Sequence, residues 1–176
     1  IIAGIDLWEV VSTDDNTETV LYPFHGLNQK TLGMRRGELV TITAGSGVGK
    51  TQICREIAYH LMNEEQTIGY IALEESTKRT ALGLMGLDVN VPLHISKEGI
   101  DENALKSAFT NTVGSGRLYL YDHFGSLATD NLLHKVRYLA KGCGVSFVIL
   151  DHLSIVVSGN DNDDERKIML LFTEKL

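Results

Sequence analysis

Hydrophobic residues along the chain fall into short runs that alternate with amphipathic segments. The apolar runs, each about as long as a buried strand, are residues 38–44, 67–74, 116–122 and 145–151. The segments with apolar positions at helical spacing are residues 50–63, 76–86, 101–111 and 129–141. Strands that are apolar along nearly their whole length and alternate with helices are typical of a parallel sheet buried on both faces. We therefore expect an α/β fold with a mostly parallel sheet and helices on both faces.

The first residues have a different pattern. Ile2, Ile5 and Trp8 recur at helical spacing, and the polar run STDDNTET follows at residues 12–19. This pattern predicts a short amphipathic helix and then a loop. We expect residues 1–19 to be a linker or a peripheral helix and loop, and residues 20–176 to form the α/β domain.

Composition narrows the classes of partner. The formal net charge of the 176 residues is −7, so a broad basic face for nucleic acid is excluded and any DNA contact must be local. The two cysteines, Cys54 and Cys143, lack ligand-like spacing, which argues against a disulfide framework or a zinc site and favours a reducing, cytoplasmic setting. No apolar run approaches the length of a membrane span, so no membrane partner is expected.

A glycine-rich turn, AGSGVGKT at residues 44–51, joins the first predicted strand to the first long helix. It matches the phosphate-loop pattern with Ala44 in place of the first glycine. Glycines let successive backbone amides turn toward one point, and the helix N-terminus adds its positive dipole end. The sequence therefore predicts that a nucleoside triphosphate is bound by Lys50, Thr51 and the preceding backbone of Gly45, Ser46, Gly47, Val48 and Gly49.

Acidic residues stand at the ends of later strands, where sites form in parallel sheets. Asp151 follows the apolar run VSFVIL and is the expected Mg²⁺ acid, with the Thr51 hydroxyl as the second protein ligand. Glu74 ends the run IGYIAL and is the expected base for water; Glu75 is its neighbour. Because side chains alternate along a strand, only one of the two glutamates should face the phosphates.

Four segments together carry a family resemblance. They are KTLGMRRGELVTITAGSGVGKT, YIALEES, LYDHFGSLATDNLLHKVRYLA and VILDHLSIVVSGNDNDDERK. They resemble the RecA-like P-loop cores of the hexameric replicative helicases, a family of phage primase-helicases, Twinkle and DnaB-like proteins. The phosphate loop alone is shared with many unrelated ATPases, whereas the last segment is far more specific.

The resemblance implies a RecA-like ATPase domain over residues 20–176 that uses Mg²⁺ with ATP or dTTP. It implies a homo-oligomer, a hexameric ring in the parent protein, that moves on single-stranded and forked DNA in a bacterial or phage-infected cell. Lys50 and Glu74 would be catalytic, Thr51 and Asp151 would hold Mg²⁺, and residues 158–167 would match a DNA-contacting loop. The family core continues with a phosphate sensor and an arginine finger that are not found here. We therefore expect an incomplete motor domain with weak activity on its own.

Two other functions remain open at this point. A RecA- or KaiC-like ATPase would share the phosphate loop but should lack the LDHLSIVVS block. A nucleotide-binding assembly module would hold nucleotide without unwinding DNA. Strand displacement on a forked duplex would separate the helicase from both.

Overall fold

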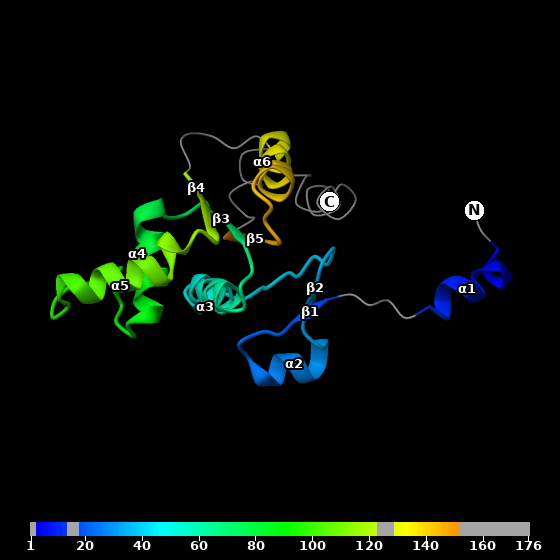
Figure 1. The fold of residues 1–176 in the computed structure, drawn as a ribbon, viewed down its shortest axis with the longest axis horizontal. Helices are drawn as coiled ribbons and strands as arrows, with labels where there is room; N and C mark the ends of the chain where they lie inside the picture. Colours follow the sequence, from blue (N-terminus) through cyan, green and yellow to red (C-terminus); the bar gives the residue numbers. More distant parts are fainter. Residues whose placement is uncertain (1–2, 14–17, 123–128, 152–176) are drawn as a thin grey trace.

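The computed structural model describes residues 3–13, 18–122 and 129–151. Figure 1 shows its helices and strands. In chain order they are η1 (Gly4–Leu7), α1 (Trp8–Val11), β1 (Thr19–Val20), α2 (His25–Thr31), β2 (Met34–Arg35), α3 (Lys50–Asn63), β3 (Ile68–Ala72), α4 (Thr77–Asp88), α5 (Glu102–Asn111), η2 (Val113–Ser115), β4 (Leu118–Tyr121), α6 (Thr129–Gly142) and β5 (Phe147–Asp151).

The central sheet is parallel, as the alternating pattern predicts. Its strand order is β4-β3-β5, and both neighbours run parallel to β3. Ile68 at the start of β3 is in register with Leu118 and Phe147, and Ala72 at its end is in register with Asp151. The carboxyl ends of β3 and β5 therefore meet at one edge of the sheet, where sites form in folds of this kind.

Strand β3 is buried on both faces, which explains its uninterrupted apolar run. Alternate residues Ile68, Tyr70 and Ala72 belong to the core cluster that includes α3, while Ile71 packs in the cluster formed with α6. Figure 1 shows α3 and α6 on opposite sides of the strands. Gly69 permits close approach of α6, because a Cβ there would lie 2.8 Å from the Leu139 side chain. The expected helices on both faces are confirmed.

The expected strand over residues 38–44 is not formed. In the part of the chain that the structure describes, this segment pairs with no strand, and Leu39, Val40 and Ile42 are partly exposed. A cavity separates it from β5. An apolar run becomes a strand only when a neighbour completes its hydrogen bonds, and no described segment does so here.

A small antiparallel pair was not predicted. Strands β1 and β2, with α2 between them, pair Thr19 with Arg35 and Val20 with Met34. The Asn28 side chain in α2 secures this unit, because it accepts from the backbone amide of residue 22 and donates to the carbonyl of the same residue, each at 2.8 Å. Two-residue strands are too short to produce a readable alternation.

At the N-terminus, η1 and α1 form short helical turns in which Ile5 and Trp8 are exposed. The division at residue 19 stays a prediction. The expected DNA-contacting loop at 158–167 lies outside the described residues. Among the helices that are described, none is both long and apolar enough to cross a bilayer.

Candidate functional site

The glycine-rich turn leads directly into α3. Residues 46–48 form the turn, and α3 begins at Lys50 with Gly49 as its N-cap. Gly47 has φ 75° and Gly49 has φ 103°, backbone angles that side-chain-bearing residues rarely adopt. The first helical hydrogen bond runs from the Ile53 amide to the Gly49 carbonyl at 3.1 Å. The local sequence thus places exposed loop amides and a 14-residue helix N-terminus at one place.

The Lys50 ammonium folds back over this turn. Its Nζ donates to the carbonyls of Ala44 and Gly45, each at 2.9 Å. These contacts hold the positive charge above the loop, where an anion bound by the loop amides would lie. Thr51 follows in the first turn of α3 and is half-buried, whereas residues 46–48 are exposed at the tip of the turn.

The strand ends bring acidic positions to the same edge of the sheet. Asp151 is the last residue of β5 and is only 5% exposed. Its backbone carbonyl accepts from the Leu73 amide at 2.7 Å, so the chain leaving β3 is tied to the end of β5. Glu74 and Glu75 follow in this turn, Glu74 exposed and Glu75 with a side chain only 10% exposed. The two glutamates therefore differ in environment, as strand alternation predicts.

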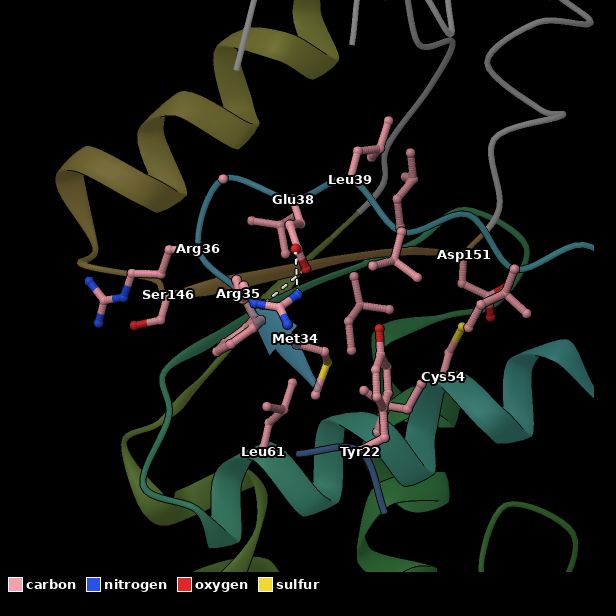
Figure 2. A pocket seen from close by; sticks show the side chains of 18 of the residues that line it. Tyr22, Met34, Arg35, Arg36, Glu38, Leu39, Cys54, Leu61, Ser146 and Asp151 are labelled. Carbon is pink, nitrogen blue, oxygen red and sulfur yellow. Dashed lines mark hydrogen bonds and ion pairs between the residues drawn. The ribbon is translucent and has the colours of Figure 1, made fainter. Parts of the chain in front are cut away.

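A cavity of about 250 Å³ lies between the segment 38–42 and β5 (Figure 2). Lys50 and Asp151, from different elements, both line it, together with Cys54 one turn into α3. Figure 2 shows Cys54 and Asp151 at the same end of this cavity. The structure thus brings the predicted phosphate-loop lysine and the predicted metal acid to one site, whereas Glu74 does not line this cavity.

The Cys54 thiol reports the charge of this site. Burial, as the larger cause, and the nearby Asp151 carboxylate raise the pKa of the thiol to about 11, because both disfavour a negative charge on the sulfur. Hard oxygen donors from Asp151 and Thr51 suit Mg²⁺, which is commonly held by one or two protein oxygens plus substrate phosphates. Among the described residues, no group of three or more His, Cys, Asp or Glu side chains could hold a metal by itself.

We predict that Cys54 alkylates slowly. With a pKa of about 11, only about 10⁻³ of the thiol is ionised at pH 8, so iodoacetamide should react with Cys54 about a hundredfold more slowly than with a free thiol. The rate should rise about tenfold per pH unit between about pH 7.5 and 9.5, and Asp151→Asn should increase it. Mass spectrometry of the Cys54 peptide measures the rate; a plateau below about pH 9 would contradict this picture of the site.

The sequence did not reveal how Glu75 is used. Its carboxylate pairs with Arg55 of α3 and accepts from the Thr80 hydroxyl of α4. Twenty residues separate Arg55 from Glu75, so no local charge pattern connects them. Asp122, at the end of β4, accepts a weak hydrogen bond from Thr77 at 3.5 Å, in keeping with a structural acid.

Comparison with known proteins gives consistent relatives. The family described as the DnaB-like helicase C terminal domain matches residues 20–172. The chain is 34% identical over 173 residues to a DNA helicase/primase of Enterobacteria phage T3, covering 96% of this chain and 31% of that protein. It is 22% identical to the replicative DNA helicase DnaC of Bacillus subtilis (strain 168), covering 82% of this chain and 32% of that one. The chain thus spans about a third of these relatives' length.

A solved structure shares the fold. This structure, an ATPase domain, superposes with a TM-score of 0.66 at 20% sequence identity, covering 92% of this chain and 59% of that chain. The predicted RecA-like α/β architecture is confirmed by this likeness together with the parallel sheet.

Proposed function

The chain belongs to the family of DnaB-like helicase C-terminal domains, and we propose that it is the motor domain of a replicative DNA helicase. In this role it binds and hydrolyses a nucleoside triphosphate, ATP or dTTP, to move along single-stranded DNA and separate a duplex. The observation that carries the proposal is the convergence of Lys50, at the head of α3, and Asp151, at the end of β5, on one cavity.

The phosphates would lie on the turn that precedes α3. The amides from Gly45 to Gly49 and the N-terminal amides of α3 supply donors and a positive dipole end. Lys50 would exchange its two carbonyl contacts for the β- and γ-phosphates, so that a charge already held over the loop is transferred to the ligand. The base and sugar are not recognised by any of these groups, which leaves both ATP and dTTP compatible with the site.

Thr51 and Asp151 would hold Mg²⁺ beside the phosphates. When bound, the ion supplies positive charge that offsets the negative charge of the phosphate oxygens. Asp151 is suited to this because it is buried at a strand end, where its position is fixed by the β3–β5 register. The hydrogen bond from the Leu73 amide to the Asp151 carbonyl links the metal acid to the turn that carries Glu74.

Glu74 would accept a proton from the water that attacks the γ-phosphate. Its exposed position at the carboxyl edge of the sheet leaves it accessible to water, in contrast to Glu75. A base placed at this edge acts beside the loop that binds the phosphates, as phosphoryl transfer to water requires.

The relatives' names motivate the partners. A helicase/primase and a replicative helicase act on DNA, and we extend to this chain single-stranded and forked DNA as substrates and a homohexameric ring as the assembly. A ring would also let a neighbouring subunit supply the arginine that neutralises charge in the transition state. The relatives' organisms suggest the cytoplasm of a bacterial or phage-infected cell. The net charge of −7 favours local DNA contacts over a broad basic face.

Nucleotide hydrolysis with and without single-stranded DNA tests the proposal in a full-length protein that contains this chain. We expect Mg²⁺-dependent hydrolysis that single-stranded DNA accelerates severalfold. Hydrolysis that DNA leaves unchanged would favour an assembly ATPase instead, and binding without hydrolysis would favour a nucleotide-holding module.

A further inference from the structure

A buried ion pair connects the phosphate-loop helix to the turn after β3. One Arg55 Nη atom lies 2.6 and 2.8 Å from the two carboxylate oxygens of Glu75. The side chains are only 4% and 10% exposed. The Thr80 hydroxyl donates to the same carboxylate at 2.9 Å, and Thr80 is fully buried. The largely exposed Arg79 approaches it to 3.5 Å from the rim. Three elements therefore meet at one carboxylate: α3, the turn after β3, and α4.

The packing around Arg55 is tight. Gly83 in α4 lies against the guanidinium, and a Cβ at Gly83 would be 2.5 Å from Nε and 2.6 Å from Cζ. A side chain at position 83 would push Arg55 away from Glu75. Glycine inside a helix costs stability relative to alanine. Its presence here allows α4 to approach the ion pair closely.

Such a pair is a poor device for stability alone. Removing two charges from water is costly, and well-packed apolar residues of similar size are often as stabilising. What the pair does provide is a fixed direction. Its position in the chain, with Arg55 in the same helix as Lys50 and Glu75 immediately after Glu74, suggests what is being fixed.

The turn that carries Glu74 is fastened on both sides. Before Glu74, the Leu73 amide donates to the backbone carbonyl at the end of β5 at 2.7 Å. After it, the Glu75 carboxylate is held by Arg55 and Thr80, and α4 begins directly with a side-chain cap at residue 76. Glu74 is the one residue between these fixed points, and it is exposed.

We infer that the Arg55–Glu75 pair, with Thr80, is a positioning device that sets where Glu74 stands relative to the phosphate loop. Because Arg55 and Lys50 share helix α3, the base and the phosphate-binding lysine are referred to one rigid element. The inference rests on the proposed role of Glu74 as the base. It assigns to Glu75 a role that acts through its neighbour rather than on the substrate.

The test replaces the pair by apolar residues of similar length, Arg55→Met/Glu75→Met, in the full-length protein. This double variant leaves no unpaired buried charge, and Thr80 keeps a contact to the Ser76 carbonyl at 3.4 Å. We expect a melting temperature near that of wild type, an unchanged KM for nucleotide, and a kcat lowered about 10- to 100-fold by the displaced base. The single variant Glu75→Gln, which keeps the shape and an acceptor for Arg55, should retain most of the wild-type kcat.

A control and a cycle separate positioning from general loosening. Tyr59→Phe removes another link between α3 and α4, the 3.1 Å hydrogen bond to Asp88, and should leave kcat unchanged. In a Glu74→Gln background the Met/Met substitution should lower kcat no further, because both changes remove the same function. Gly83→Ala displaces Arg55 without removing a charge and should also lower kcat, which serves if the double variant does not fold.

An active wild type whose Met/Met and Gly83→Ala variants keep full kcat would overturn the inference alone. A further drop of equal size in the Glu74→Gln background would also overturn it, since the pair would then act through another group. A wild-type protein that binds but never hydrolyses nucleotide would instead overturn the proposed function, and with it the role of Glu74.

Discussion

Glu74→Gln is expected to lower nucleotide hydrolysis by about 10²- to 10⁴-fold in the full-length protein, the usual scale for loss of a general base. The amide keeps the size of the carboxylate but cannot accept the proton from water. Nucleotide affinity should change little, because the phosphates are bound by the loop and Lys50 rather than by this exposed side chain. Steady-state hydrolysis and calorimetry measure the two quantities separately.

Glu98→Gln is the matched control, since it neutralises another exposed glutamate in a turn. It should hydrolyse nucleotide at the wild-type rate. Full activity of Glu74→Gln would show that water is activated by a different group and would remove the reason for fixing the turn after β3.

Lys50→Ala is expected to weaken nucleotide binding by about 10²-fold or more, because hydrogen bonds to charged groups contribute about 1.5–3 kcal/mol each and Lys50 would make two with phosphates. The same change removes the donor that now holds the Ala44 and Gly45 carbonyls, so the empty loop should also loosen. Calorimetric titration with Mg–ATP and Mg–dTTP measures the loss.

Lys106→Ala serves as the control for Lys50→Ala. This lysine pairs with Glu102 on the exposed surface of α5, and such pairs contribute little. The affinity of this variant for nucleotide should equal that of wild type. If Lys50→Ala also binds as wild type does, the glycine-rich turn is not the phosphate site.

The sequence was most informative where local pattern and tertiary environment agree. Strand β3 reads as a strand because both of its faces are covered, and the start of α3 is marked by glycines that only its N-terminal turn requires. The segment 38–44 shows the limit of such reading. Its apolar residues are those of a buried strand, yet strand formation depends on a partner supplied from elsewhere in the chain.

The candidate site divides in the same way. Lys50, Thr51 and Asp151 could be located from the sequence because phosphate and metal binding demand particular residue types after particular elements. The fastening of Glu75 could not, since Arg55 is 20 residues away and neither residue stands in a recognisable pattern. Only the packing of α3 against α4, with a glycine of α4 against the guanidinium, makes that contact readable.

Strand displacement tests the central claim most directly. A full-length protein containing this chain is mixed with forked DNA, Mg²⁺ and ATP or dTTP, and release of the displaced strand is followed against a Lys50→Ala control. The account predicts unwinding by the wild type and none by Lys50→Ala. A wild-type protein that hydrolyses nucleotide yet leaves the fork intact in the presence of either nucleotide would contradict the assignment of this domain as a helicase motor.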